Sequence, residues 1–491
     1  MREYQDYDAL GLAQLIQTDE ATPSALLEAA IARCEAVNPA LNAVIVPLYE
    51  QARSQARQPP PQAPFAGVPF LLKDLLAALQ GAPLANGCRA LKGWVPDYDS
   101  ELVRRFKAAG VVIFGKTNTP EFGLLGYTEP EAWGPTRNPW SLTHSPGGSS
   151  GGAAAAVAAG IVPMAHGGDG GGSIRIPASN CGLFGLKPSR GRIPLGPDFG
   201  EVWAGAVQEG VVSRSVRDTA AMLDCVAGPE QGAPYVIAGP AATFAHAASQ
   251  PPPRLRIGAV LSTPDTPMHA DCRTAVETTM SLLHELGHDV EEVALPYDHA
   301  QLLDCYLTMY YGETATDLRW LARHLGRPLR RGDVELETWI LGRMGEQLRA
   351  ADFSAAKRDW NLLARAMGRF HQQYDLLLTP TLAAPPTRIG ELKTPPLQRA
   401  ALSAIATLGG IGLLRKAIHE QACINFARMP YTQLANLTGQ PAMSVPLHWN
   451  AAGLPIGVQF VAPINREDCL LSLACQLETA RPWAHRRPML A

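Results

Sequence analysis

Residues 145–194 read SPGGSSGGAAAAVAAGIVPMAHGGDGGGSIRIPASNCGLFGLKPSRGRIP and present a serine in each of two glycine-rich turns, Ser149 and Ser173. Apolar or β-prone sequence follows each turn at once, AAAAVAAGIVPMA after the first and SIRIP after the second. A flexible glycine-serine linker would not be followed in this way, so we expect both turns to lie within a folded core.

The glycines before the second serine suit the chemistry of acyl transfer. Gly170, Gly171 and Gly172 lack a Cβ, so the backbone can turn tightly and direct several N–H groups into one concavity that would hold an oxyanion. A serine nucleophile also needs a base. None of the 12 histidines lies in a recognisable triad motif. We therefore consider Lys73 of GVPFLLKDL as the base, because a buried lysine can lose its charge and Ser149 can relay the proton.

Three segments together resemble the amidase signature family: GVPFLLKDL around Lys73, GGSSGG around Ser149 and GGSIRIPASNCGLFGLKPSRGR around Ser173. The resemblance extends over most of the chain and implies that Ser173 is the nucleophile. It also implies that Ser149, in a cis peptide, relays the proton and that Lys73 is the base that later protonates the leaving amine. It assigns the oxyanion hole to the N–H groups of Gly170, Gly171, Gly172 and Ser173.

One loop departs from the family pattern. The family usually reads Gly-Thr-Asp-Thr-Gly-Gly-Ser, whereas this chain has glycine at both threonine positions, Gly168 and Gly170. The backbone donors survive this change. We expect the loop to be looser and the pocket near the nucleophile to be roomier.

The order of predicted elements indicates an α/β protein. From Phe65 onward, short apolar strands such as VVIFGK alternate with helices such as DSELVRRFKAAG. The resemblance implies a single large α/β/α layered domain with a central mixed, mostly parallel twisted sheet flanked by helices. We divide the chain into an N-terminal helical segment, 1–64, that packs on the core, and an amidase signature domain, 65–491. Within the N-terminal segment, Thr22 and Pro23 predict the start of a helix that Asn38-Pro39 would end.

A mostly helical insertion, about 297–372, is expected to shape the substrate pocket. Tyrosines and tryptophans recur there at helical spacing, and such side chains suit a pocket wall. We predict five substrate-binding residues, although core packing explains the aromatic stripe equally well: Asn118, Trp133, Tyr310, Tyr311 and Asn425.

Two other motifs suggest different chemistry. His284-Glu285-Leu286-Gly287-His288 matches the H-E-x-x-H zinc signature. However, Gly287 is a favoured residue just past a helix end, so His288 would lie outside the helix that carries His284. The glycine-rich runs lack the lysine of a phosphate-binding loop. We therefore expect no metal and no organic cofactor.

Composition points to a small-molecule enzyme. The net charge of −3 and the lack of a long basic run give no reason to expect nucleic acid or a membrane as a partner. The N-terminus has no signal-peptide pattern, and the nine cysteines include no C-x-x-C, so we expect a cytoplasmic protein with reduced thiols. The sequence leaves open whether the chain forms a homodimer.

We expect an amidase that hydrolyses C–N bonds of small amides through an acyl-enzyme, and that also accepts esters and carbamates. The segments at 128–140, 326–329 and 481–483 are most similar to bacterial 6-aminohexanoate cyclic dimer hydrolases and related amidases. A urethane hydrolase and the glutaminase-type subunit of an amidotransferase, which belongs to the same family, are the alternatives. A binding module without activity would not need all three of Lys73, Ser149 and Ser173.

Overall fold

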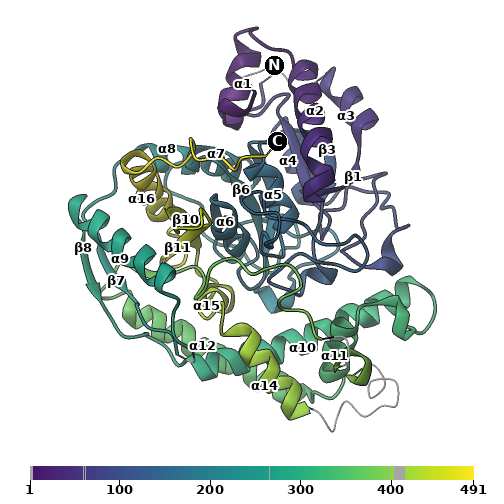
Figure 1. The fold of residues 1–491 in the computed structure, drawn as a ribbon, viewed down its shortest axis with the longest axis vertical. Coiled ribbons are helices and arrows are strands. Elements are labelled where there is room, and N and C mark those ends of the chain that lie inside the picture. Colours follow the sequence, from purple (N-terminus) through teal and green to yellow (C-terminus); the bar gives the residue numbers. More distant parts are fainter. Residues whose placement is uncertain are drawn as a thin grey trace.

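The computed structural model describes residues 4–58, 60, 62–264, 266–395, 398–402 and 415–490. Its central feature is an eight-stranded mixed sheet with the strand order β4-β6-β5-β10-β11-β9-β7-β8. The strands of this sheet are β4 (Met164–Asp169), β5 (Phe184–Lys187), β6 (Gln208–Ser213), β7 (Arg256–Ala259), β8 (Asp289–Glu292), β9 (Leu376–Pro380), β10 (Ala442–Trp449) and β11 (Pro455–Val461). Helices flank the sheet, which confirms the expected α/β layered domain (Figure 1).

The expectation that parallel pairing dominates this sheet is wrong. In the described residues, β7 pairs in parallel with β8 and β9, and every other neighbouring pair of the sheet is antiparallel. The alternation of strands and helices predicts a layered sheet, but not the direction in which each strand enters it. β10 and β11, for example, form a hairpin around a tight turn in which the Asn450 N–H donates to the Leu454 carbonyl.

A second, three-stranded sheet has the order β1-β3-β2. Its strands are β1 (Val44–Pro47), β2 (Pro69–Lys73) and β3 (Val112–Thr117). β1 belongs to the predicted N-terminal segment and pairs with β3, so the two parts of the chain share a sheet. The helices before and between these strands are α1 (Ala9–Gln17), α2 (Pro23–Leu41), α3 (Tyr49–Ala56) and α4 (Glu101–Ala108).

Helix α2 begins as predicted but ends later. Thr22 caps its first turn by accepting the N–H of Ala25, and Pro23 is the first helical residue. The helix continues past Asn38-Pro39 to Leu41, and Asn42 ends it in the left-handed conformation. The Asn38 side chain accepts the N–H groups of Ala43 and Val44 and so fixes the chain just beyond the helix.

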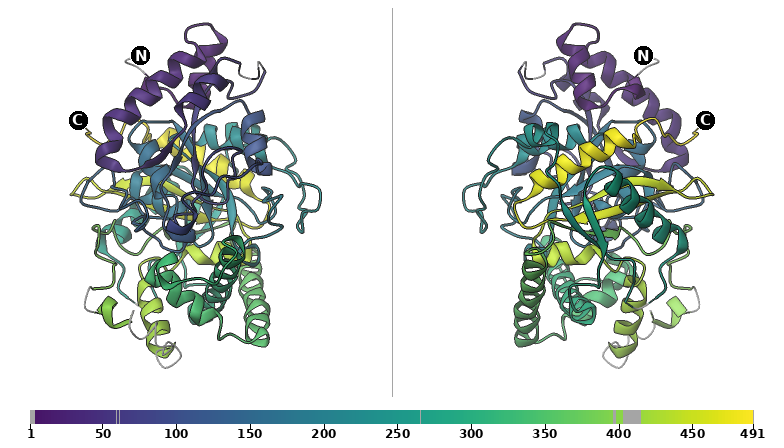
Figure 2. Two further views of the ribbon diagram at one scale, coloured as in Figure 1. Left: turned by 90° about the vertical axis from the view of Figure 1, so that its right-hand side faces the viewer. Right: turned by 90° about the vertical axis from the view of Figure 1, so that its left-hand side faces the viewer.

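The remaining helices lie against the central sheet or at one end of the molecule (Figure 1). They are α5 (Gly151–Ala158), α6 (Arg175–Cys181), α7 (Val216–Val226), α8 (Phe244–Ser249), α9 (Ala270–Glu285), α10 (His299–His324), α11 (Leu336–Gly345), α12 (Ala350–Phe370), α14 (Arg415–Phe426), α15 (Thr432–Thr438) and α16 (Glu467–Ala480). Figure 2 shows α10, α11 and α12 at the opposite end of the molecule from α1 and α2. In the described part of the chain, no helix is long and apolar enough to cross a membrane.

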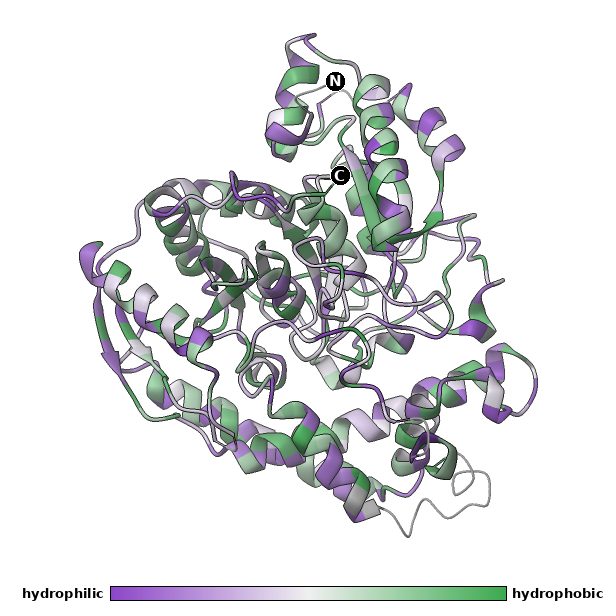
Figure 3. Cartoon of the chain, viewed as in Figure 1, coloured by the Kyte–Doolittle hydropathy of each residue, from purple (hydrophilic) through white to green (hydrophobic). Residues whose placement is uncertain are grey.

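Helix α5 explains why the first glycine-rich turn is held firmly. All of its residues are buried, and all of them are glycine, alanine or valine. A Cβ on Gly152 would lie 2.4 Å from the backbone nitrogen of Asn118, so small residues are needed for β3 and α5 to approach this closely. Outer helices such as α12 instead alternate hydrophilic and hydrophobic residues along their length (Figure 3).

We expect the substitution Ala154→Leu in α5 to destabilise the protein by about 1–3 kcal/mol, because the fully buried Ala154 has no space for three more carbon atoms. The measurement is the midpoint of thermal unfolding. Ala351→Leu in α12 is the matched control, since Ala351 is exposed and the same added bulk should leave the midpoint nearly unchanged. Equal midpoints for the two variants would contradict this account of α5.

Candidate active site

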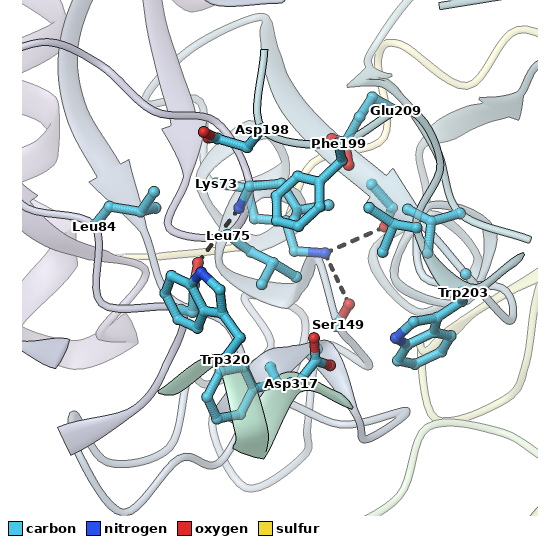
Figure 4. Close-up of a pocket in the computed structure, with 18 of the residues that line it drawn as sticks. Lys73, Leu75, Leu84, Ser149, Asp198, Phe199, Trp203, Glu209, Asp317 and Trp320 are labelled. Carbon is cyan, nitrogen blue, oxygen red and sulfur yellow. Dashed lines mark hydrogen bonds between the residues drawn. The ribbon is translucent and has the colours of Figure 1, made fainter. Parts of the chain in front are cut away.

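The structure brings the two glycine-rich turns to the end of strand β2. Lys73, the last residue of β2, is buried, and its ammonium nitrogen lies 2.7 Å from Ser149 Oγ and 3.2 Å from the Gly168 carbonyl oxygen (Figure 4). The Gly148-Ser149 peptide bond is cis. Lys73, Ser149 and Ser173 line one cavity.

Hydrogen bonds of Ser150 connect the two turns to each other. The Ser150 N–H donates to the Ser173 carbonyl at 3.1 Å. The Ser150 hydroxyl bonds to the Gly168 carbonyl and accepts the Gly168 N–H, both at 3.2 Å. These contacts fix Ser149 and Ser173 relative to each other.

Asp169, at the end of β4, organises the loop that carries Ser173. Its carboxylate accepts the N–H groups of Gly172 at 2.7 Å and Ile174 at 3.1 Å, and it forms a two-point ion pair with Arg175 at 2.9 Å. Complete burial alone would raise the pKa of Asp169, but the Arg175 guanidinium and the Asn436 amide hold that pKa well below its usual range. The carboxylate therefore stays charged and keeps the turn closed.

This arrangement corrects the expected set of oxyanion donors. The Gly172 N–H is engaged by Asp169, so it is not free for an oxyanion. Within the described residues, the N–H groups of Gly170, Gly171 and Ser173 donate to no protein acceptor. Of these three residues, Gly170 and Ser173 line the cavity.

The extra space expected beside Gly168 and Gly170 is not present, while the looser loop stays a prediction. A Cβ on Gly168 would lie 2.6 Å from Glu209 Oε1, and a Cβ on Gly170 would lie 2.9 Å from a Val207 methyl carbon and 3.0 Å from the Trp203 ring. The space that threonine side chains would take is therefore filled by side chains from β6 and from the segment that precedes it.

Glu209 also links the cavity wall to Lys73. Its carboxylate lies 2.5 Å from His166 Nε2, and His166 Nδ1 accepts the Lys73 backbone N–H at 3.2 Å. Since Nδ1 accepts, the ring proton lies on Nε2 and is donated to Glu209. Burial lowers the pKa of the Lys73 ammonium to about 8, while Glu209 and Asp169 act in the opposite direction.

The cavity at these residues has a volume of about 470 Å³ and a mainly apolar lining that includes several aromatic side chains. Trp203, Phe199 and Trp320 line it, and Asp317 of α10 also faces it (Figure 4). Asp317, Trp203 and Glu209 were not predicted from the sequence as lining residues. The spacing of Asp317 and Trp320, three residues apart on a predicted helix, is a signal that could have placed both on one face.

The five residues predicted to bind substrate do not line this cavity. Tyr310 and Asn425 line a second cavity of about 480 Å³ instead. Tyr310 donates its hydroxyl to the Leu124 carbonyl at 2.5 Å and packs against Trp203, so it supports the wall of the first cavity from behind. Tyr311 packs beside Tyr310, also in the buried core.

Asn118 and Trp133 have structural surroundings. The Asn118 amide donates to the Gly134 carbonyl and the Thr136 hydroxyl, both at 3.0 Å. The Lys92 ammonium lies 4.2 Å from the centre of the Trp133 ring. Neither residue lines either of the two large cavities of the described structure.

The H-E-x-x-H motif is divided as predicted. Helix α9 ends at Glu285, and Gly287 follows with φ +90°. His288 lies beyond the helix, where its Nδ1 accepts the Leu255 N–H at 3.1 Å and its Nε2 lies 2.8 Å from Gln476. The described residues contain no group of three or more histidine, cysteine or carboxylate side chains placed to hold a metal ion.

Comparison with known proteins agrees with this geometry. A 6-aminohexanoate-cyclic-dimer hydrolase of Pseudomonas sp. (strain NK87) is 42% identical over 497 residues, which covers 98% of this chain and 96% of the relative. The corresponding enzyme of Paenarthrobacter ureafaciens is 41% identical over 494 residues, with coverage of 98% and 96%.

Solved structures show the same fold. A 6-aminohexanoate cyclic dimer hydrolase in complex with its substrate has a TM-score of 0.88 at 40% identity and covers 99% of both chains. A bacterial aryl acylamidase of the amidase signature family has a TM-score of 0.84 at 29% identity, with coverage of 98% and 99%. The model of the family described as Amidase matches residues 25–471. This chain therefore belongs to the amidase signature family of hydrolases.

Proposed function

We propose that the protein hydrolyses C–N bonds of small amides through an acyl-enzyme, with Ser173 as nucleophile, Ser149 as proton relay and Lys73 as base. The observation that carries this proposal is the 2.7 Å contact between Lys73 and the Ser149 hydroxyl, in the cavity that Ser173 also lines. Membership of the amidase family supports the reaction class.

In the first half of the reaction, neutral Lys73 takes the proton of Ser149 while Ser149 takes that of Ser173. Ser173 Oγ attacks the carbonyl carbon, and the N–H groups of Gly170, Gly171 and Ser173 stabilise the oxyanion. The C–N bond then breaks, and the proton held by Lys73 returns through Ser149 to the leaving amine. The acyl group remains on Ser173 as an ester.

In the second half, water attacks this ester and loses its proton along the same path. Collapse of the oxyanion releases the carboxylic acid and restores the Ser173 hydroxyl. Esters and carbamates share the attack and oxyanion steps and differ in the leaving group, so we propose that they are accepted as well, and urethane hydrolysis follows from the same chemistry. The large aromatic cavity argues against glutamine as the main substrate, which the glutaminase alternative requires.

We expect Ser173→Ala and Lys73→Ala each to lower kcat for an aryl amide by at least about a thousandfold, since each removes a group that the chemical step needs. Steady-state kinetics on purified protein checks this. Thr316→Ala, in the wall of the same cavity, is the control and should retain most of the activity. Unchanged kcat in Ser173→Ala would exclude Ser173 as the nucleophile.

We also expect kcat/KM to rise with pH through about 8, because Lys73 must be neutral to accept a proton and burial lowers its pKa to that value. The Glu209 carboxylate raises the pKa of Lys73, so Glu209→Gln should move the rising limb to lower pH. Rate measurements across this range on one aryl amide test both statements. A profile that is flat through this range, or a limb that Glu209→Gln moves to higher pH, would contradict them.

A further inference from the structure

One wall of the cavity carries a carboxylate that the proposed mechanism does not use. Asp317 of α10 is half-buried and lines the cavity. Trp203 and Trp320 lie near it, and the carboxylate points into the cavity toward Ser149 (Figure 4). A hydrogen bond from the Trp203 side chain stabilises its charged form.

Among the described residues, no lysine or arginine forms an ion pair with Asp317, although Arg323 also lines the cavity. Within the described residues, the neighbouring Arg319 pairs with Glu346 at 2.7 Å, and Lys357 of α12 lies 3.8 Å from Glu201. No ion pair of the described structure includes Asp317. Burial raises the pKa of Asp317 to about 7, and the nearby Glu313 carboxylate adds to this effect. A cation in the cavity would lower this pKa and so offset the effects of burial and of Glu313.

The other two acids of the cavity already have partners. Glu209 accepts from His166, and Asp198, at the exposed mouth, accepts from the Tyr98 hydroxyl. Asp317 likewise accepts one neutral hydrogen bond, from Trp203, but it is neither exposed like Asp198 nor close to the Lys73 ammonium like Glu209. It is therefore the carboxylate of this cavity whose charge a ligand would stabilise most. The indole rings of Trp203 and Trp320 suit the same ligand, because the faces of tryptophan rings attract ammonium groups.

We propose that Asp317, Trp203 and Trp320 form a subsite for a protonated amine, so that the enzyme prefers amides with an ammonium group at the end remote from the scissile bond. This inference rests on the proposed function for the position of the scissile amide. Linear amides of ω-amino acids are the substrate class that carries both groups. The aliphatic chain of such a substrate would lie along the apolar lining between Ser173 and α10.

A matched pair of substrates tests the subsite. 6-Aminohexanoyl 4-nitroanilide carries an ammonium group where heptanoyl 4-nitroanilide carries a methyl group. We expect wild-type protein to prefer the amine in kcat/KM by about tenfold or more, the size expected for a charge-assisted contact. Asp317→Asn should abolish this preference and leave the rate on the neutral substrate nearly unchanged.

Asp198→Asn is the control, because it removes a charge from the same cavity at its mouth. It should keep the preference for the amine. Equal losses on both substrates in Asp317→Asn, with an unchanged unfolding midpoint, would overturn the proposal. A wild-type preference for the neutral substrate would do the same.

A binding measurement separates this inference from the proposed function. Calorimetry should show that hexylammonium binds wild-type protein about tenfold or more tightly than 1-hexanol does, and that Asp317→Asn loses the difference. If the protein shows this binding preference but hydrolyses neither anilide, the amidase proposal is refuted and the subsite is still supported. Equal affinity of the two probes for wild-type protein would refute the subsite.

Discussion

The buried ion pair between Asp169 and Arg175 is the contact on which the site depends. Asp169 ends β4 and holds the turn before α6 through the Gly172 and Ile174 N–H groups, while Arg175 reaches Gln459 of β11 at 2.6 Å. Asn436 of α15 donates to the same carboxylate. This ion pair therefore joins β4 and α6 to the more distant α15 and β11, and it holds the turn that contains Gly170, Gly171 and Ser173.

The sequence was sufficient for features that rest on local chemistry. Two glycine-rich turns followed by apolar runs predicted that Ser149 and Ser173 lie in a core, and Gly287 predicted that His288 lies beyond its helix. It was not sufficient for features set by distant partners. The direction in which β5 and β6 enter the sheet and the extension of α2 past Pro39 depend on contacts far along the chain or just beyond the helix.

The lining of the cavity, too, could be predicted only in part from the sequence. The tyrosine stripe of α10 predicted an aromatic face, and Tyr310 does pack against the cavity wall, but Trp203 stands between it and the cavity. Periodicity places Tyr310 on the buried face of α10, but it cannot show that Trp203, from another part of the chain, covers that face. Only the packing of the segment around Trp203 against α10 decides which of them contacts a ligand.

The contact between Gly168 and Glu209 also constrains how this loop can evolve. The family pattern that this chain resembles has threonine at the position of Gly168, and a Cβ there would lie 2.6 Å from Glu209 Oε1. The two positions are therefore coupled, and their substitutions should not contribute independently. A threonine can enter this loop only if the Glu209 carboxylate moves or the residue is shorter, and moving it disturbs the contact with His166. The effect of a substitution at either position should therefore depend on the residue at the other.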